Sequence, residues 1–392
     1  MRICPKMVAM VTILTGISPV IAESQEHVID TGGFEDSAAH WRNIRDDNRF
    51  IQAEKKQPRY RSTQIREIAG NILLFQRTNG GWPKDYDMAA VLTEEQQTIV
   101  ATTRDREDTS FDNHNTFPQV QYLAEAYKLT GDESFQKGAE RGLNFMLAAQ
   151  YPNGGVPQWF PRTESYHGHI TLNDGAMMGV MRTWQRVAEG KPEFAWVDSD
   201  RREKARNAVK QGVECLLKCQ IPVGGKRTGW CQQHDRETLA AAPARTFEPA
   251  SICPGDTTEV LEFLMSLQSP SPEVVTAVEE GMEWLEEVKL TGIRIERVKA
   301  EKEKFLRHSA NFDVVVMEDA NAPSIWARHY EIGTNRPIFS GRDGIIRYSL
   351  AEVERERRTG TKWYGEWPAE LLRTGYTAWR MRVGVEKVSV SK

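Results

Sequence analysis

Three loops of this chain share one design, and their spacing constrains the fold more than any other feature of the sequence. Each follows a helical pattern and carries a Gly-Gly pair: QRTNGGWPKD (76–85), QYPNGGVPQWFP (150–161) and QIPVGGKRTGWCQQHD (220–235). Such a pair suits a left-handed helix C-cap followed by a tight turn. The pairs begin at Gly80, Gly154 and Gly224, about 70 residues apart, which is one helical hairpin plus its loop. The sequence therefore predicts stacked helical hairpins.

Amphipathic patterns fill the intervals between these loops. Helices are expected at 115–130, 134–149, 174–189 and 202–219, with two more at 256–268 and 272–289. The apolar residues that line one face of the second and third helices are Leu143, Met146, Ala149, Met177, Met181, Trp184 and Val187. Hairpins repeated at this period stack so that their loops gather on one rim and line a cleft. The predicted fold is mainly α: a partial α/α toroid of stacked helical hairpins with a small β-containing C-terminal part.

The pattern changes after Gly292. GIRIERV (292–298) and FDVVVME (312–318) are typical of strands, and GTNRPIFSGRDGIIRYSL (333–350) is typical of a hairpin-rich segment. A last helix is expected near 368–382. We therefore predict one catalytic domain over 60–392, with strands at about 292–350. It is preceded by an irregular N-terminal arm over 23–59, where no clear periodicity is found.

The N-terminus predicts export. Arg2 and Lys6 flank an apolar run that ends in small residues, a pattern typical of a secretory signal peptide, here placed at 1–22. The mature protein is then secreted or periplasmic, and no other segment approaches the length of a membrane span. Loss of Arg2 and Lys6 takes the formal net charge from −4 to −6. This charge argues against non-specific binding to nucleic acid or anionic membranes. Oligomeric state cannot be inferred from the sequence.

Four cysteines remain after the signal, and all fall in one stretch: Cys215, Cys219, Cys231 and Cys253. In an exported protein one or two disulfides are the first expectation. Cys215 and Cys219 are four residues apart on a predicted helix, which also fits two small buried residues. A zinc site comes third, because the spacing matches no common zinc pattern.

Two Asp/Asn pairs stand where predicted helices begin. Asp112 and Asn113 precede the helix at 115–130, and Asn173 and Asp174 open the helix at 174–189, one repeat later. A single Asp at a helix start most often caps free N–H groups. Two pairs on equivalent rims of stacked hairpins can instead share one site. They would hold a hard cation, which favours carboxylate and amide oxygens, or act as an acid and base pair.

Other polar residues lie on later loops. The third loop brings His234 and Asp235, to which we assign a supporting role in orienting loop or substrate, and arginines follow at Arg245, Arg328 and Arg342. Guanidinium grips carboxylates in a bidentate manner. Arginines gathered in the loops of an acidic, exported protein, beside carboxylates suited to a cation, indicate an anionic ligand. Uronic acid polymers fit.

A family resemblance becomes specific at this point. The segments SFDNHNTFPQVQYLAEAY, GGVPQWFP, HITLNDGAM, GWCQQHD followed by AR, and WARHYEIGTNRPIFSGRDG occur in order between about residues 65 and 367. They resemble those of the family 10 polysaccharide lyases, which are pectate lyases with a partial α/α toroid. Five segments in sequence make a specific match, whereas one alone would not.

The resemblance implies calcium-dependent β-elimination of polygalacturonate, which gives unsaturated oligogalacturonides. It implies that Asp112, Asn113 and Asp174 are associated with Ca²⁺ and that Arg245 is the Brønsted base. Substrate binding falls to Arg328 and Arg342, with Asn173 from the ND pair. The chain departs from the family where DNHNT replaces the more usual DNGAT. It departs again in RTFE, where Thr246 directly follows Arg245 and the family often has an aromatic residue.

The mechanism predicts an alkaline optimum, because a free guanidinium is almost always protonated. We expect a dry, positively charged site to lower the pKa of Arg245. Two alternatives stay open: an α/α-toroid uronate hydrolase that uses Asp112 and Asp174 as acid and base, and a non-catalytic pectin-binding protein. A tryptophan follows each Gly-Gly pair: Trp82, Trp159 and Trp230. The sequence supports two roles equally, stacking against a bound sugar or packing the loop onto a helix as a buttress.

Overall fold

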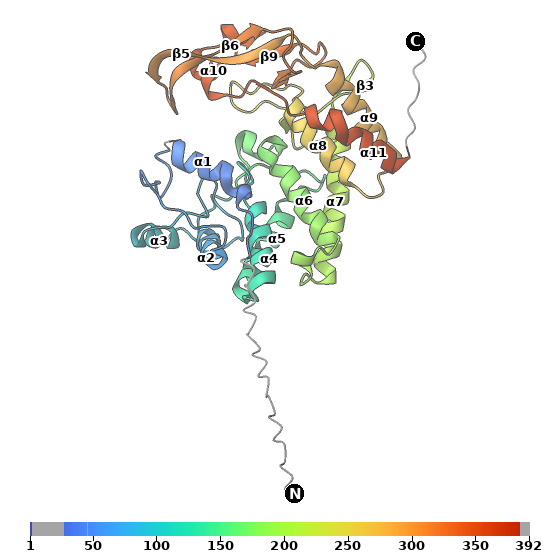
Figure 1. The fold of residues 1–392 in the computed structure, drawn as a ribbon. Coiled ribbons are helices and arrows are strands. Elements are labelled where there is room, and N and C mark those ends of the chain that lie inside the picture. The colour runs from blue at the N-terminus through green and yellow to red at the C-terminus, as the bar shows by residue number, and fades with distance from the viewer. Residues whose placement is uncertain (2–26, 45, 385–392) are drawn as a thin grey trace.

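The computed structural model describes residues 1, 27–44 and 46–384 (Figure 1). The predicted signal peptide at 1–22 lies outside these residues apart from Met1. None of the helices in the described ranges has the length and apolar character needed to cross a bilayer.

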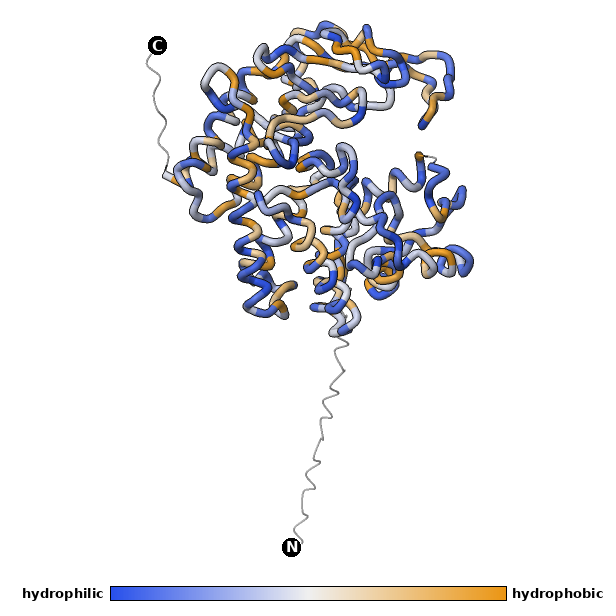
Figure 2. Tube along the Cα trace, turned by 180° about the vertical axis from the view of Figure 1, so that it is seen from behind, coloured by the Kyte–Doolittle hydropathy of each residue, from blue (hydrophilic) through white to orange (hydrophobic). Residues whose placement is uncertain are grey.

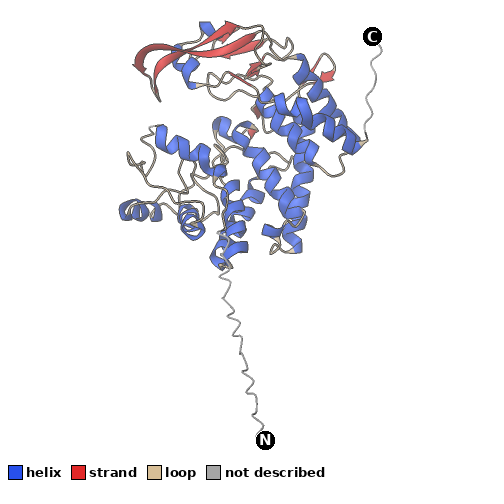
Figure 3. Cartoon of the chain, in the orientation of Figure 1, coloured by secondary structure: helices blue, strands red, loops and turns tan. Residues whose placement is uncertain are grey.

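Stacked helical hairpins form the body of the molecule, as predicted (Figure 3). The hairpin helices are α4 (Phe117–Thr130), α5 (Glu133–Ala149), α6 (Ala176–Ala188), α7 (Ser199–Cys219), α8 (Pro254–Ser266) and α9 (Pro272–Glu287). Helices α4, α6 and α8 pack in one row, and α5, α7 and α9 pack in a second row. An earlier helix, α2 (Ile65–Phe75), packs against α4 and α5. The mainly α fold, a partial toroid, is confirmed.

The apolar faces read from the sequence are the faces that the helices bury. Met177, Met181 and Trp184 of α6 are fully buried, and Leu143 and Met146 of α5 are also in the core. Burying side chains of this size stabilises a fold by about 1.5–3 kcal/mol each before entropy is counted. This burial, rather than helix propensity, holds the two rows together.

The repeated loops use a glutamine, not a glycine, as the helix C-cap. Helices α2, α5 and α7 end at the extended residues Gln76, Gln150 and Gln220. Each glutamine Nε2 donates one hydrogen bond into its own loop and one to a carbonyl of the next outer helix, at 2.8–3.0 Å. The expectation of a left-handed glycine C-cap is therefore wrong. The side-chain amide bonds one carbonyl of the turn and one of the next outer helix. The glutamine therefore fixes the turn on that helix while its own backbone leaves the preceding helix in an extended conformation.

The glycines act in the turn that follows. Gly80 and Gly154 have φ of 97° and 91°. A Cβ on Gly80 would lie 2.4 Å from the Arg141 carbonyl oxygen, and one on Gly154 would lie 2.1 Å from that of Gln211. Each turn therefore sits directly on the backbone of the outer helix. Trp82 and Trp230 follow these turns, are fully buried, and donate their indole N–H to helix carbonyls at 2.7 Å. These two tryptophans are buttresses.

The C-terminal part carries the strands. Its largest feature is an antiparallel hairpin of β5 (Ile293–Lys304) and β6 (Ser309–Glu318), both longer than the sequence pattern indicated. Shorter pairs join β7 (Trp326–Ala327) to β11 (Tyr364–Gly365), and β9 (Pro337–Ser340) to β8 (His329–Tyr330) and β10 (Ile346–Arg347). The remaining helices there are α10 (Arg355–Gly360) and α11 (Tyr376–Val383). Two small pairs lie in the rim loops, β1 (Ile170–Thr171) with β4 (Gln233–His234), and β2 (Pro222–Val223) with β3 (Lys226–Arg227).

The N-terminal arm is less irregular than the sequence indicated. It contains α1 (Glu35–Asn43), and α3 (Glu94–Ala101) packs on α2 beyond it. Phe34 and Trp41 anchor α1 in the core. The sequence of α1 has too few apolar residues to show a helical period. The reason is that the polar face of this helix packs against polar loops.

The disulfide expectation is wrong. All four described cysteines are free and buried. Cys215 and Cys219 lie one turn apart on the buried face of α7, with their Sγ atoms 4.0 Å apart, about twice a disulfide bond length. The second expectation, buried thiols, is the one that the structure supports. No cluster of three or more metal-binding side chains is found among the described residues.

Candidate active site

Bridges of backbone hydrogen bonds join the rim loops sideways. Isolated bridges pair Pro83 with Thr109 and Ser110 with Trp159, and β1 then pairs with β4 of the third loop. His114 N also donates to the Asp174 carbonyl oxygen at 3.4 Å. The loops of successive hairpins therefore form one continuous floor, as the repeat predicted.

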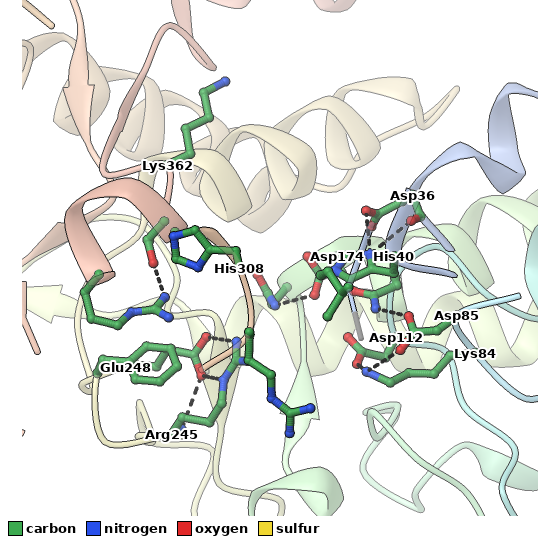
Figure 4. Close-up of a pocket in the computed structure, with 18 of the residues that line it drawn as sticks. Asp36, His40, Lys84, Asp85, Asp112, Asp174, Arg245, Glu248, His308 and Lys362 are labelled. Carbon is green, nitrogen blue, oxygen red and sulfur yellow. Dashed lines mark hydrogen bonds and ion pairs between the residues drawn. The ribbon is translucent and has the colours of Figure 1, made fainter. Parts of the chain in front are cut away.

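A cleft of about 740 Å³ lies on this floor, with walls of opposite charge (Figure 4). Its acidic wall comes from the N-terminal arm and the first two loops: Asp36, Asp85, Asp112 and Asp174. Its basic wall comes from later segments of the chain: Arg245, Arg342, Arg357 and Lys362. Such a cleft gathers cations on one side and anions on the other.

Asp112 is the buried centre of the acidic wall. It is 6 % exposed, its backbone N–H bonds Ser110 Oγ at 2.9 Å, and its carboxylate accepts a short hydrogen bond from Lys84 Nζ. Burial favours a higher pKa for Asp112, but the Lys84 ammonium outweighs it and the pKa falls to about 2. Asp112 is therefore a carboxylate at any ordinary pH.

Asp174 meets Asp112 across the loops. The two side chains hydrogen-bond to each other, and burial together with the Asp112 charge raises the pKa of Asp174 well above its usual range. Asn173 Nδ2 donates to Asp174 Oδ2 at 2.6 Å. The structure thus brings together the two carboxyl groups that the sequence placed on equivalent rims, where the charge on Asp112 opposes a second negative charge on Asp174.

The backbone around the pair is strained. Asn113, His114, Thr116 and Asp174 all have φ between 51° and 72°, a region that non-glycine residues rarely occupy. Each such residue costs about 1–3 kcal/mol, and such costs cluster at functional sites. Asn113 is held by a 2.6 Å hydrogen bond from its Nδ2 to Asp85 Oδ1.

The donor set around Asp112 fits a hard cation. Gln158 lines the same cleft and hydrogen-bonds to Asp112, while its Oε1 is buried without a hydrogen-bond partner. An orphaned amide oxygen beside two carboxylates is an arrangement that Ca²⁺ satisfies. Lys84 Nζ, in contact with Asp112 and 3.8 Å from Asp85 Oδ2, supplies the positive charge in this structure.

Arg245 stands on the opposite wall and is paired. Its Nε and Nη2 donate to Glu248 at 2.8 and 2.5 Å, and its side chain is 54 % exposed. Burial favours a lower pKa for Arg245, but Glu248 outweighs it and the pKa is raised. The expectation that the site lowers the pKa of Arg245 is not met, because Glu248, three residues further along the same loop, turns its carboxylate onto the guanidinium.

Arg328 and Arg342 lie in different surroundings. Half-buried Arg328, between β7 and β8, donates from Nη2 to Asn173 Oδ1 at 3.1 Å. It therefore reaches the carboxylate pair through the asparagine. Arg342 is 38 % exposed and pairs with Glu356 through Nε at 2.5 Å and Nη2 at 2.6 Å.

One arginine of the basic wall was missed by the sequence analysis. The Arg357 guanidinium lies 3.9 Å from the Phe247 ring centre, a ring that Arg245 and Arg342 also approach at 4.8 and 5.5 Å. Its Nε is buried without a partner, and none of the carboxylates in the described ranges forms an ion pair with it. Burial, with help from the neighbouring arginines, lowers its pKa to about 10. The sequence VERERRTG reads as a solvated charge run, so nothing local marked this residue.

His234 and Asp235 lie outside the residues that line the cleft. His234 is fully buried in β4, where its ring accepts a hydrogen bond from Cys231 N at 3.1 Å and bonds the Leu239 carbonyl at 3.0 Å. Asp235 holds the next turn by accepting from Thr238 N at 2.8 Å. Both side chains shape the third loop.

Lys84 and Asp36 are further cleft residues that the sequence analysis did not single out. Lys84 follows the first Gly-Gly pair, in GGWPKD, so its place on the rim was readable. Asp36 was not readable, because α1 was not predicted. His114, where DNHNT departs from the family pattern, bonds Asp36 Oδ2 through Nδ1 at 3.3 Å.

Comparison with known proteins identifies the family. The sequence model of the family described as pectic acid lyase matches residues 76–372. The chain belongs to the pectic acid lyase family. Among solved structures, a family 10 polysaccharide lyase from Cellvibrio cellulosa is similar at 27 % identity and a TM-score of 0.68, covering 81 % of this chain and 91 % of that one. No curated protein matches the chain.

A second solved structure bears on the ligand. It is a mutant of the family 10 polysaccharide lyase from Cellvibrio cellulosa in complex with trigalacturonic acid, with 27 % identity and a TM-score of 0.69 over 81 % of this chain and 92 % of that one. The family resemblance drawn from the sequence is confirmed, and this lyase is a polysaccharide-cleaving enzyme of the pectate lyase class.

Proposed function

We propose that this lyase cleaves polygalacturonate by calcium-dependent β-elimination, with Arg245 as the base, and releases unsaturated oligogalacturonides. The observation that carries the proposal is the polarised cleft. It sets a buried carboxylate pair, Asp112 and Asp174, against a wall of arginines. A uronate chain carries one carboxylate per sugar, so it needs both a shared cation and guanidinium donors.

Calcium would be held by Asp112 and Asp174 with amide oxygens from Asn113 and Gln158. When bound, it withdraws charge from the uronate carboxylate as the C5 proton leaves. Two carboxylates and two amides are fewer than the six to eight oxygens that Ca²⁺ takes. We therefore infer that the substrate carboxylate completes the site.

The arginines divide the remaining work. Arg357 lines the cleft on the Phe247 ring and, among the described residues, donates only to the Thr361 hydroxyl, so its guanidinium is available to a substrate carboxylate. Arg328 holds Asn173, and through it orients Asp174. Arg342 lines the outer part of the same wall. Guanidinium donors aimed at the sugar carboxylate stabilise the charge that develops on it.

Arg245 takes the proton from C5 in this proposal, while the electron pair left on C5 forms the C4–C5 double bond and expels the C4 oxygen. Glu248 opposes this role in the ligand-free cleft because it stabilises the protonated guanidinium. The Arg245–Glu248 pair must therefore part when substrate binds. The half-exposed position of Arg245 allows this movement.

A hydrolase is the less favoured alternative. Hydrolases that use two carboxyl groups keep them about 5–9.5 Å apart, to leave room for the sugar and water. Asp112 and Asp174 hydrogen-bond directly to each other, which suits a shared cation better than separate acid and base roles. The signal-like N-terminus supports the further proposal that the enzyme acts after export.

The test is a continuous ultraviolet assay on polygalacturonate at alkaline pH, with calcium and then with excess EDTA. The proposal expects absorbance from the unsaturated product, lost with EDTA, restored by calcium, and abolished in Arg245→Ala. Reducing sugar without absorbance would move Asp112 and Asp174 to hydrolytic roles. Binding of polygalacturonate with no product of either kind would indicate a binding protein.

A further inference from the structure

A short turn in the second rim loop places a tyrosine in the cleft. The turn η2 (Ser165–Gly168) carries Tyr166 and His167, and both side chains line the cleft. Residues of the helical body and of the C-terminal part line this cleft together, and the two parts lie one above the other in both views of the chain (Figures 1 and 2). Tyr166 is therefore a cleft residue that neither the cation site nor the arginine wall accounts for.

The turn is held in place by its own loop. The His167 carbonyl accepts a hydrogen bond from Gln158 N at 3.0 Å. The Tyr151 hydroxyl donates to the Gly168 carbonyl at 2.8 Å. The position of Tyr166 is thus fixed by contacts of the backbone around it, and its hydroxyl takes no part in them.

Three aromatic rings lead from the acidic wall to this tyrosine. The Lys84 ammonium lies 6.0 Å from the centre of the Trp159 ring. The ring centres of Trp159 and His167 are 5.1 Å apart, and those of His167 and Tyr166 are 4.2 Å apart. Such contacts fix the plane of each ring against its neighbour. Tyr166 stands at the end of this row of rings.

The phenol of Tyr166 lies between the two charged walls. Arg245 and Glu248 act on it from one side, and Lys84 and Asp112 act on it from the other. Figure 4 shows these two groups of side chains on opposite sides of the cleft. A sugar bound between the walls would therefore meet the Tyr166 hydroxyl.

This hydroxyl is free to donate. None of the described residues forms a hydrogen bond with it, in contrast to the hydroxyl of Tyr151. Burial raises the pKa of Tyr166, and the charge of Arg245 opposes this rise without cancelling it. Tyr166 therefore keeps its proton at alkaline pH. Burial lowers the pKa of His167, so the neighbouring imidazole is neutral under the same conditions.

The elimination needs a proton for its leaving group. When the bond between C4 and its glycosidic oxygen breaks, that oxygen keeps the bonding electrons and becomes a strongly basic alkoxide. In galacturonate the C5 hydrogen and the C4 oxygen stand on opposite faces of the ring, so the base that removes one proton cannot deliver it to the oxygen. Tyr166 and Arg245 come from different loops, and no hydrogen bond joins them among the described residues. A base and a proton donor on opposite sides of a sugar require this separation.

We propose that the Tyr166 hydroxyl gives its proton to the C4 oxygen as the glycosidic bond breaks. Arg245 takes the C5 proton, the C5–H electron pair forms the C4–C5 double bond, and the oxygen leaves as a hydroxyl of the released chain. The Tyr166 phenolate then regains a proton from water, and Arg245 returns its proton to the solvent. This inference rests on the proposed β-elimination of polygalacturonate.

The experiment varies the leaving group. Polygalacturonate expels a sugar alkoxide, which needs a proton. A digalacturonate with a dinitrophenyl group on its terminal C4 oxygen expels dinitrophenolate, which needs none. The wild type and Tyr166→Phe, which keeps the ring and loses the hydroxyl, are assayed on both substrates. Tyr151→Phe is the matched control, because it removes a hydroxyl that holds the same turn but does not line the cleft.

Tyr166→Phe is expected to lower kcat on polygalacturonate by about 100-fold or more, which is what a general acid supplies, with KM little changed. On the dinitrophenyl substrate it should match the wild type. Tyr151→Phe should keep the wild-type ratio of the two activities. Because the Tyr166 hydroxyl bonds no described residue, its removal should leave the melting temperature unchanged.

Two results would overturn the proton-donor role. An equal loss on both substrates would show that Tyr166 only positions the sugar. An undiminished rate on polygalacturonate would show that water or another group protonates the oxygen. Absence of unsaturated product from the wild type would instead overturn the proposed function.

Discussion

Glu248 is the side chain that most directly controls the state of Arg245. Its two oxygens hold the guanidinium and raise the pKa of the proposed base. In Glu248→Gln the pKa of Arg245 is expected to fall, so that the deprotonated form becomes available at lower pH. The rising limb of the kcat/KM profile against pH should move down by about one pH unit, the size expected for one half-exposed carboxylate.

The matched control is Glu356→Gln, which removes the same kind of pair from Arg342. Because Arg342 is assigned to substrate binding, this variant should change KM and leave the rising limb in place. If the rising limb shifts in Glu356→Gln but not in Glu248→Gln, the base is Arg342 and the assignment to Arg245 is wrong.

Lys84 is a second residue with a charge role. Its ammonium contacts Asp112, and although burial favours a lower pKa, Asp112 and Asp85 raise the pKa of Lys84. A cation that binds Asp112 must displace or repel this ammonium. Lys84→Met should therefore tighten calcium binding by about tenfold in titration calorimetry. Asp112→Asn should weaken it by at least as much, and tighter binding in both variants would place the ion elsewhere.

At the scale of the element, the repeated turn is a packing device. Gly154 combines a positive φ with contact to the Gln211 backbone, whereas Gly224 has a positive φ but open space around it. Gly224→Ala should cost only the strain of the left-handed conformation, about 1–2 kcal/mol. Gly154→Ala should cost about 2 kcal/mol more, because the methyl group would force the turn away from α7. Urea unfolding of the two variants measures the difference, and equal losses would show that the turn relaxes freely.

At the scale of the whole molecule, the arm is attached to the site by a titratable contact. Asp36 of α1 accepts from His40, at 3.3 Å from its Nδ1, and from His114, which lies just before α4. Burial favours a lower pKa for His40, but Asp36 outweighs it and raises the pKa to about 9. Because the folded pKa exceeds the unfolded value of about 6.5, this stabilisation is complete below pH 6.5. It is lost as the pH rises through 9.

The wild type should therefore lose on the order of 1 kcal/mol between pH 6.5 and 9.5, an amount that allows for the partial exposure of the pair. His40→Gln should lose less over the same interval. Thermal unfolding of both proteins across this range gives the comparison. Parallel curves would show that the arm contact does not titrate. The proposed alkaline activity thus falls where the arm is held least firmly.

Much of the architecture was predictable because it is local. The periods of apolar residues in α5 and α6 predicted their buried faces, and the nearly equal spacing of Gly80, Gly154 and Gly224 predicted the stacking. The positions of Asp112 and Asp174 at successive helix starts predicted their meeting, since equivalent loops of stacked hairpins must be neighbours. The thiols of α7 show the limit of such reasoning, because composition and compartment suggested a bond that helix geometry does not form.

The sequence by itself determined which segments become helices, where their rim loops fall and which carboxylates those loops carry, because short-range periodicity and chain spacing specify each of these. Only the tertiary structure decided that Glu248 turns onto Arg245, that Arg357 lies on the Phe247 ring with its Nε unbonded, and that the β5–β6 tip faces Asp46. The Arg245–Glu248 pair joins residues three apart in one loop, but only the loop conformation turns the two side chains together. The surroundings of Arg357 and of the hairpin tip depend on the distance between segments that are not related by the repeat. The sequence shows which arginines lie in the rim loops. Whether each guanidinium can lose its proton depends on the charged groups that the fold places beside it, so the sequence alone does not determine its pKa.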